Sequence, residues 1–176
     1  LPLRTRLSDE EVARFAVNRY RFPGVEIKAR LFRQYPYGEV ASHVIGYIGR
    51  INDRDVERIA GWEDTANYKG SDYIGKVGLE FSYERELHGT TGWEEVEVDA
   101  AGRAVRTLSR TAPVGGNNLR LSLDIKLQEA AEAAFRDRRG ALVAIEPATG
   151  DVLAFVSRPG YDPNLFVDGI DATNWQ

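Results

Sequence analysis

A glycine-rich segment is the first place where residue types and spacing could do chemistry. Residues 70–76 have the Gly-x4-Gly-Lys spacing of a phosphate-binding loop. The next residue is Val77, however, where magnesium binding calls for a Ser or Thr hydroxyl, and residues 62–69 are mostly polar rather than a buried strand. We therefore interpret the segment as an ordinary glycine-rich loop and expect no bound nucleotide or other cofactor.

Histidines and clustered carboxylates are the next candidates, for metal binding or acid–base catalysis. His43 and His88 lie far apart in the chain, and neither has a second histidine at metal-ligand spacing. His88 falls in the last turn of a predicted helix, where the helix dipole stabilises a positive charge. The acidic run at residues 94–99 lacks the glycine turn of a calcium loop. We expect structural or surface roles for these residues and no metal site.

A serine nucleophile activated by lysine would need the pattern Ser-x-x-Lys, which places the amine one helical turn from the hydroxyl. None of the four lysines has it, because the residues three positions earlier are Val25, Ala66, Tyr73 and Leu123. Ser-x-Asn, Lys-Thr-Gly and Gly-x-Ser-x-Gly are also missing from the sequence. We therefore assign no catalytic residues and expect this chain alone not to be an enzyme. An unrelated enzyme that uses its carboxylates, such as a glycosidase, has no positive support.

Composition narrows the remaining function classes. The 176 residues are 43% hydrophobic and 28% charged, which is typical of a globular protein. The net charge of −4 argues against coating nucleic acid, and the absence of cysteine excludes disulfides and thiolate metal sites. The longest apolar runs have five residues, far fewer than the ~20 of a membrane helix. The absence of methionine indicates a chain taken from a longer product.

The first 112 residues contain the patterns of a mixed α+β domain of short helices and antiparallel strands. Ser8 and Glu11 have the spacing of a capping box, which predicts the start of a helix. Residues 25–31 alternate between apolar and charged, which predicts a half-buried strand. The other expected elements are a turn at residues 35–38, a short helix between Asn52 and Gly61, a helix at 79–88, and a hairpin of strands 92–99 and 104–108 that turns at 100–103.

Residues 113–118 form the strongest linker signal, with one proline, two glycines and two asparagines. We place the domain boundary there, between residues 1–112 and residues 119–176. The second part is expected to contain a strand at 119–123, a helix at 124–136 and a hairpin of strands 141–145 and 152–157. The apolar face of that helix is predicted to consist of Leu127, Ala131, Ala134 and Phe135. Residues 159–176 show no period, so we interpret this part as an incomplete domain.

Several separated motifs together resemble one bacterial family. Residues 33–38, 41–50, 75–92 and 98–103 resemble the pedestal, or dimerisation, domain of class B penicillin-binding proteins, most closely the elongation-specific type. Residues 121–128 and 140–154 resemble the start of the transpeptidase domain of that family. The pedestal positions that match the family pattern are Arg33, Tyr35, Pro36, His43, Gly46, Tyr47, Gly75, Gly78, Leu79, Glu80, Tyr83, Leu87, Gly89, Gly92, Asp99 and Gly102.

The resemblance implies a function for a longer protein. Members are D,D-transpeptidases at the periplasmic face of the bacterial inner membrane, anchored by one helix, that cross-link peptidoglycan stem peptides through an acyl-serine and are acylated by β-lactams. Their catalytic motifs lie downstream of the matched region. The resemblance therefore implies that this chain supplies a non-catalytic pedestal. Its expected partners are an MreC-type scaffold and a RodA-type glycosyltransferase, with no nucleic acid.

Two further expectations concern the incomplete domain. Gly115 and Gly116 are candidate hinge residues between the pedestal and the catalytic part. The apolar face of helix 124–136 and hairpin 141–157 is expected to be covered by self-association, by segment exchange or by another part of the enzyme. The alternative hypothesis is a complete, small binding module of the cell envelope.

Overall fold

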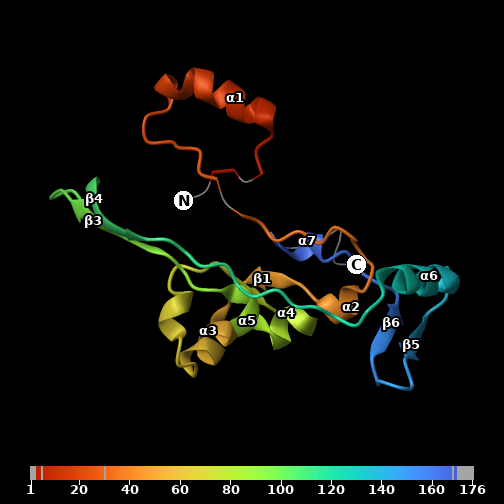
Figure 1. Ribbon diagram of the computed structural model, residues 1–176. Helices are drawn as coiled ribbons and strands as arrows, with labels where there is room; N and C mark the ends of the chain where they lie inside the picture. Colours follow the sequence, from red (N-terminus) through yellow and green to blue (C-terminus); the bar gives the residue numbers. More distant parts are fainter. Residues whose placement is uncertain (1–2, 5, 30, 168, 170–176) are drawn as a thin grey trace. The chain divides into compact units, whose positions relative to one another are not determined.

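A computed structural model describes residues 3–4, 6–29, 31–167 and 169, and the chain divides into two units, Leu1–Phe32 and Arg33–Gln176 (Figure 1). The first unit contains helix α1 (Asp9–Asn18) and the 3-10 turn η1 (Arg19–Arg21). The Glu11 amide donates to the Ser8 hydroxyl, and the Ser8 amide donates to the Glu11 carboxylate. The predicted capping box is therefore confirmed.

The strand predicted at residues 25–31 is wrong. Its described residues, 25–29 and 31, have no strand conformation, and the apolar side chains of Ile27 and Leu31 are exposed. Alternation selects a face only when a second strand supplies backbone hydrogen bonds, since a strand is not stable by itself in water. No strand among the described residues pairs with this segment.

The second unit is organised around a small antiparallel pair, β1 (Ile48–Arg50) and β2 (Tyr73–Gly75). Ile59, Tyr68 and Ile74 form the buried core beside these strands. The surrounding elements are α2 (Ser42–Ile45), α3 (Asp53–Ala60), the 3-10 turn η2 (Thr65–Tyr68), α4 (Gly78–Ser82) and α5 (Glu84–His88). Asn52 and Asp55 form a capping box at α3, as the sequence predicts for its start. The predicted helix at 79–88 is present as two helices, because the backbone of Tyr83 leaves the helical region.

Two glycines allow the end of α2 and the start of α4 to touch backbone to backbone. Gly46 has φ +77° and ψ −156°, a conformation that is essentially restricted to glycine. A Cβ on Gly46 would lie 1.8 Å from the Val77 carbonyl oxygen, and one on Gly78 would lie 2.6 Å from the Val44 carbonyl oxygen. Both positions therefore require glycine for packing as well as for backbone conformation.

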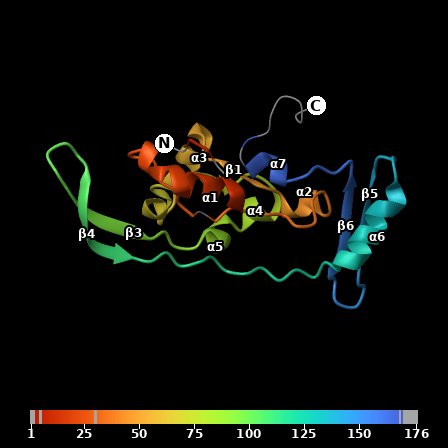
Figure 2. The same cartoon turned by 90° about the horizontal axis from the view of Figure 1, so that it is seen from above.

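The hairpin of β3 (Trp93–Val98) and β4 (Ala104–Thr111) is confirmed, with β4 three residues longer than predicted. Gly102, at φ +76°, lies in its turn. Every residue of both strands is exposed, and ion pairs such as Glu94–Arg110 and Glu97–Arg106 cross between the strands. The hairpin and the α6–β5–β6 elements lie at opposite ends of the second unit in both views (Figure 2).

The last elements are α6 (Ile125–Phe135), β5 (Gly140–Ile145), β6 (Val152–Arg158) and α7 (Asn164–Val167). The helix capped by Asp124 and the β5–β6 hairpin are confirmed. The predicted strand at 119–123 is wrong. Hydrogen bonds from the Ser122 hydroxyl to the Val152 carbonyl and from the Asp124 amide to the Leu153 carbonyl connect this region to β6 without a ladder.

The predicted apolar face of α6 is also partly wrong, since Leu127 and Ala134 are exposed and Gln128 is completely buried. The side-chain amide of Gln128 donates to the Phe155 carbonyl oxygen over 2.9 Å and accepts from the Phe155 amide over 2.8 Å. Gln128 therefore supplies hydrogen-bond partners to the backbone amide and carbonyl of β6 on the edge where the two-stranded sheet has no further strand. This pairing turns the helix so that a polar residue faces the sheet.

None of the helices in the described part of the chain has the length and apolar character needed to span a bilayer.

Candidate interaction site

The residues considered for phosphate or metal chemistry have structural partners. The ammonium group of Lys76 pairs with the Asp55 carboxylate beside α3. His88 lies 3.0 Å from the Ser71 hydroxyl through Nε2, and its ring stacks on Tyr68 with centroids 4.2 Å apart. The ring of His43 meets that of Tyr161 edge-on. Among the described residues, no group of three or more histidines, cysteines or carboxylates is arranged to hold a metal ion.

Three of the family-pattern residues form one network around the buried carboxylate of Glu80. The Arg33 guanidinium donates to Glu80 Oε1 over 2.6 Å, and the Tyr35 hydroxyl donates to the same oxygen over 3.1 Å. The Tyr35 hydroxyl also accepts from the Ile48 amide. Burial, together with the Glu80 carboxylate, raises the pKa of Tyr35. The network thus joins the segment before α2 to β1 and α4.

A second buried carboxylate, Glu84, lies one helical turn further along. It accepts from the Gly75 amide over 2.6 Å and from the Tyr68 hydroxyl over 3.2 Å. Burial raises the pKa of Glu84, although its hydrogen bonds and the nearby His88 act in the opposite direction. Gly75 is also where β2 meets α4, since a Cβ there would lie 1.9 Å from the Glu80 carbonyl oxygen.

Glu84 should make the folded chain less stable as the pH rises. Its pKa is higher in the folded chain, so the unfolded chain loses this proton first as the pH rises above the ordinary value of 4.5. Between the pKa of the unfolded chain and the higher pKa of the folded chain, the free energy of unfolding falls as the pH rises. Above the folded pKa the loss is complete and does not grow further. In Glu84→Gln, urea unfolding at a series of pH values should therefore show a free energy of unfolding that falls less between pH 4.5 and 8 than in the parent chain.

The control for this measurement is Glu86→Gln, because Glu86 is exposed on the same helix. It should reproduce the pH profile of the parent chain. An unchanged profile in Glu84→Gln would refute the assignment.

The α6–β5–β6 elements are attached to the segment that precedes β1. The side-chain amide of Asn164 forms two 2.9 Å hydrogen bonds with the backbone of Tyr35, one to each polar group. The Glu132 carboxylate of α6 accepts from the Ala41 amide over 2.8 Å. The Tyr161 hydroxyl donates to the Ser42 carbonyl oxygen over 3.0 Å. These contacts join residues that are 91 to 129 positions apart in sequence.

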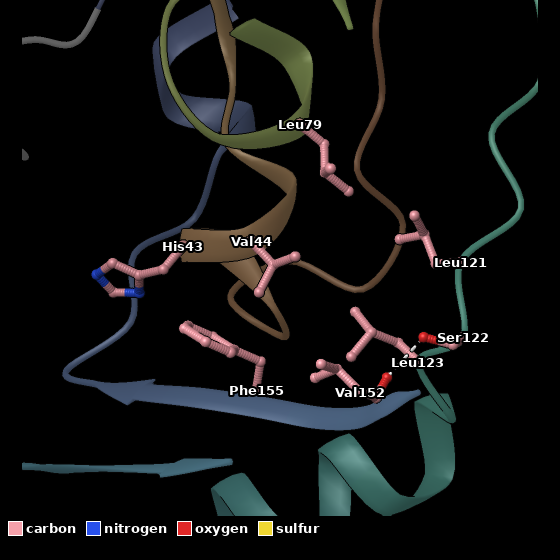
Figure 3. A pocket seen from close by; sticks show the side chains of 8 residues that line it. All are labelled: His43, Val44, Leu79, Leu121, Ser122, Leu123, Val152 and Phe155. Atoms are coloured by element: carbon pink, nitrogen blue, oxygen red, sulfur yellow. Dashed lines mark hydrogen bonds between the residues drawn. The ribbon is translucent and has the colours of Figure 1, made fainter. Parts of the chain in front are cut away.

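An open, mostly apolar hollow of about 380 Å³ lies beside this attachment (Figure 3). Side chains from α2, α4, β6 and the segment before α6 converge on it, and Ser122 at its rim bonds to Val152. Its lining residues are His43, Val44, Leu79, Leu121, Ser122, Leu123, Val152 and Phe155. Apart from His43 and Ser122, the side chains that line the hollow are apolar. What covers the exposed apolar side chains of β5, such as Val143 and Ile145, stays a prediction.

The structure brings together only part of the family pattern found in the sequence. Gly89 and Gly92 lie against the chain at residues 111–116, where a Cβ would come within 2.4 Å and 2.6 Å of carbonyl oxygens. Asp99 and Gly102 lie apart from these in the hairpin turn, where Asp99 accepts from the backbone of Ala101 and Arg103. Sequence reasoning missed Gln128, Glu132, Tyr161 and Asn164. Each acts by bonding a distant backbone, which leaves no local pattern in the sequence.

The sequence model of one protein family, the Penicillin-binding Protein dimerisation domain, matches residues 1–121, which are more than half of the chain. The chain belongs to the penicillin-binding protein dimerisation-domain family. This confirms the resemblance found in the sequence, and the mixed helices and short antiparallel strands agree with solved members of this family.

Penicillin-binding protein relatives match almost the entire chain. Peptidoglycan D,D-transpeptidase MrdA of Escherichia coli K12 is 51% identical over 175 residues, which are 99% of this chain and 28% of that protein. MrdA of Acinetobacter baumannii is 48% identical over 169 residues, or 96% of this chain and 25% of that protein. The chain thus spans about a quarter of the length of these relatives.

Solved structures of penicillin-binding proteins agree with this relationship. Pseudomonas aeruginosa PBP2, in complex with WCK 5153, has a TM-score of 0.68 and 45% identity, covering 85% of this chain and 29% of that one. The Helicobacter pylori PBP2 complex with MreC has a TM-score of 0.78 and 30% identity, covering 97% of this chain and 31% of that one. The chain is therefore similar to the pedestal region of penicillin-binding protein 2 and to the residues that follow it.

Proposed function

We propose that this chain is the pedestal region of a peptidoglycan D,D-transpeptidase of the penicillin-binding protein 2 type. The observation that carries the proposal is the 51% identity with MrdA along 99% of the chain. The buried networks around Glu80 and Glu84 support it, because they fix the helices and β1–β2 as a rigid base. In the complete enzyme this base holds the catalytic part away from the membrane, at the periplasmic face.

The chain's own role in the proposal is binding and positioning. Its family pattern contains no nucleophile, and the acyl-serine chemistry belongs to residues downstream of it. Stem peptides and β-lactams are accordingly substrates and inhibitors of the complete enzyme. A stand-alone binding module of the cell envelope is the alternative, and it would have no covalent chemistry in any context.

A fluorescent penicillin tests this division of roles. The complete enzyme should be labelled covalently and should lose the label on competition with unlabelled penicillin, whereas the 176-residue chain should remain unlabelled on a denaturing gel. A label on any serine of this chain would contradict the proposed function. A complete gene product that also stays unlabelled would favour the stand-alone module.

We further propose an MreC-type scaffold as a partner of this region. The support is the similarity to the Helicobacter pylori PBP2 that was solved with MreC, which extends over 97% of the chain. A RodA-type glycosyltransferase is a second proposed partner, taken from the family resemblance. Both would act on the pedestal and so influence a catalytic part that they do not touch.

A further inference from the structure

Residues 158–167 run from the end of β6 back to the segment before β1, and we call this stretch the latch. It has no sequence period, yet the side chains of Pro163 and Val167 in it are fully buried. Helix α7, which contains Val167, packs against β1. The latch is therefore a packed connection between the α6–β5–β6 elements and the residues at 33–48.

Asn164 makes the most specific contact of the latch. Its side-chain amide donates to the Tyr35 carbonyl oxygen and accepts from the Tyr35 amide, so it occupies both polar groups of one backbone position. The Asp162 carboxylate accepts from the Asn164 side-chain amide over 2.8 Å and from its backbone amide over 2.9 Å. Asp162 thereby holds the Asn164 side chain in the orientation that fits Tyr35.

Aromatic side chains close the latch on the same segment. The ring of Phe166 stacks on that of Tyr47 with centroids 4.1 Å apart. Tyr161 meets the rings of His43 and Tyr47 edge-on, and its hydroxyl donates to the Ser42 carbonyl oxygen. Ring contacts of this kind depend on geometry, so they weaken together when the latch shifts.

A charged contact lies at the other end of the latch. Arg158 lies 3.4 Å from a Glu39 carboxylate oxygen and 3.7 Å from one of Glu132. Glu132 also accepts from the amide of Ala41, which has a left-handed φ of +55°. Helix α6 and the latch therefore both contact the same short turn before α2.

The glycine pair at 115–116 is connected differently. A Cβ on Gly116 would lie 2.0 Å from the Leu87 carbonyl oxygen, and the Asn117 amide donates to the Glu86 carbonyl oxygen over 2.7 Å. Val114 also exchanges two 2.9 Å backbone hydrogen bonds with Thr90. These contacts attach residues 114–117 to the pedestal at and just after α5, and none of them involves α6, β5 or β6.

We propose that the latch, rather than bending at Gly115–Gly116, controls how the α6–β5–β6 elements are held on residues 33–48, and that it opens as one unit. Opening would release Tyr35, Ala41 and Ser42 together and widen the hollow beside Val44 and Phe155. The role of this motion in an enzyme rests on the proposed function: a partner bound to residues 33–48 would bias the latch and thereby the catalytic part.

Amide hydrogen exchange of this chain, followed by NMR, tests the latch without any enzymatic activity. Asn164→Ala should accelerate exchange of the Tyr35 amide about ten- to hundredfold, because its acceptor is removed. If the latch opens as a unit, the Ala41 amide, whose acceptor is Glu132, should accelerate by a similar factor. The Ile51 and Val56 amides, which bond to Asp72 and Asn52, should be unchanged.

Asn118→Ala is the matched control, because this asparagine is exposed in the linker and should leave all four amides unchanged. Acceleration at Tyr35 alone would overturn the proposal, since it would show an isolated bond rather than a unit. If Asn164→Ala also accelerates Ile51 and Val56, Tyr161→Phe decides, because it removes one hydroxyl only. It should accelerate both Tyr35 and Ala41, and no change at either would overturn the proposal.

This exchange test and the penicillin test fail separately. A chain whose latch amides respond as expected, within an enzyme that penicillin does not label, would retain the latch and lose the proposed function. A labelled enzyme whose latch amides exchange independently would retain the proposed function and lose the latch.

Discussion

Gly46→Ala should lower the free energy of unfolding of the chain by about 4 kcal/mol, a large fraction of the roughly 5–15 kcal/mol that stabilises a typical domain. Two causes combine at this position. The backbone at φ +77° and ψ −156° is unfavourable for alanine, and the added Cβ would overlap the Val77 carbonyl oxygen at 1.8 Å. Neither can be relieved by a side-chain movement, because the atoms that an added Cβ would meet belong to the backbone of Val77 and Gly78. Urea unfolding followed by tryptophan fluorescence measures the loss.

Gly102→Ala is the control for this measurement. Gly102 has nearly the same φ, +76°, but an added Cβ there has no atom within 4 Å. Gly102→Ala should lower the free energy of unfolding by about 1 kcal/mol, because only the left-handed backbone conformation disfavours alanine there. Equal losses in the two variants would show that the close approach of α2 and α4 contributes nothing to stability.

Local chemistry explains which parts of this fold could be predicted from sequence. Ser8 with Glu11, Asn52, and Asp124 each start a helix through bonds within three residues, so their patterns are complete in the sequence. The turn at Gly102 is equally local. By contrast, residues 25–31 and 119–123 have strand-like patterns without a paired strand, and a single sequence does not reveal whether a partner exists.

The attachment of α6–β5–β6 could not be predicted for a related reason. Asn164 and Gln128 bond to the backbones of Tyr35 and Phe155, and any residue type except proline could supply those backbone groups. Neither side of such a pair leaves a pattern at helical or strand spacing. The Gly115–Gly116 pair, which the sequence suggested as a hinge because of its glycine content, lies in a segment that contacts the pedestal. Whether it bends remains a prediction.

Arg33, Tyr35 and Glu80 were recognised in the sequence only as separate positions of the family pattern. Because the structure joins them in one network, loss of Arg33 should have a large effect on stability. Arg33→Gln should lower the free energy of unfolding by about 3 kcal/mol, because it leaves the Glu80 carboxylate buried without its cation. The side chain of Glu80 is only 4% exposed, so water compensates its charge poorly once the guanidinium is removed. Arg33 itself is 43% exposed, which keeps the expected loss at the lower end for buried pairs.

A double-mutant cycle separates this effect from the loss of arginine packing. In Arg33→Gln/Glu80→Gln neither position of this pair carries a charge, so the double variant should be more stable than the sum of the single losses predicts, by about 1 kcal/mol or more. The exposed hairpin pair Glu94–Arg110, at 3.1 Å, is the matched control, and its cycle should give less than about 0.5 kcal/mol. Equal coupling energies in the two cycles would mean that burial of Glu80 has no energetic consequence. The network would then be an incidental contact rather than the part that fixes α4 against the segment before α2.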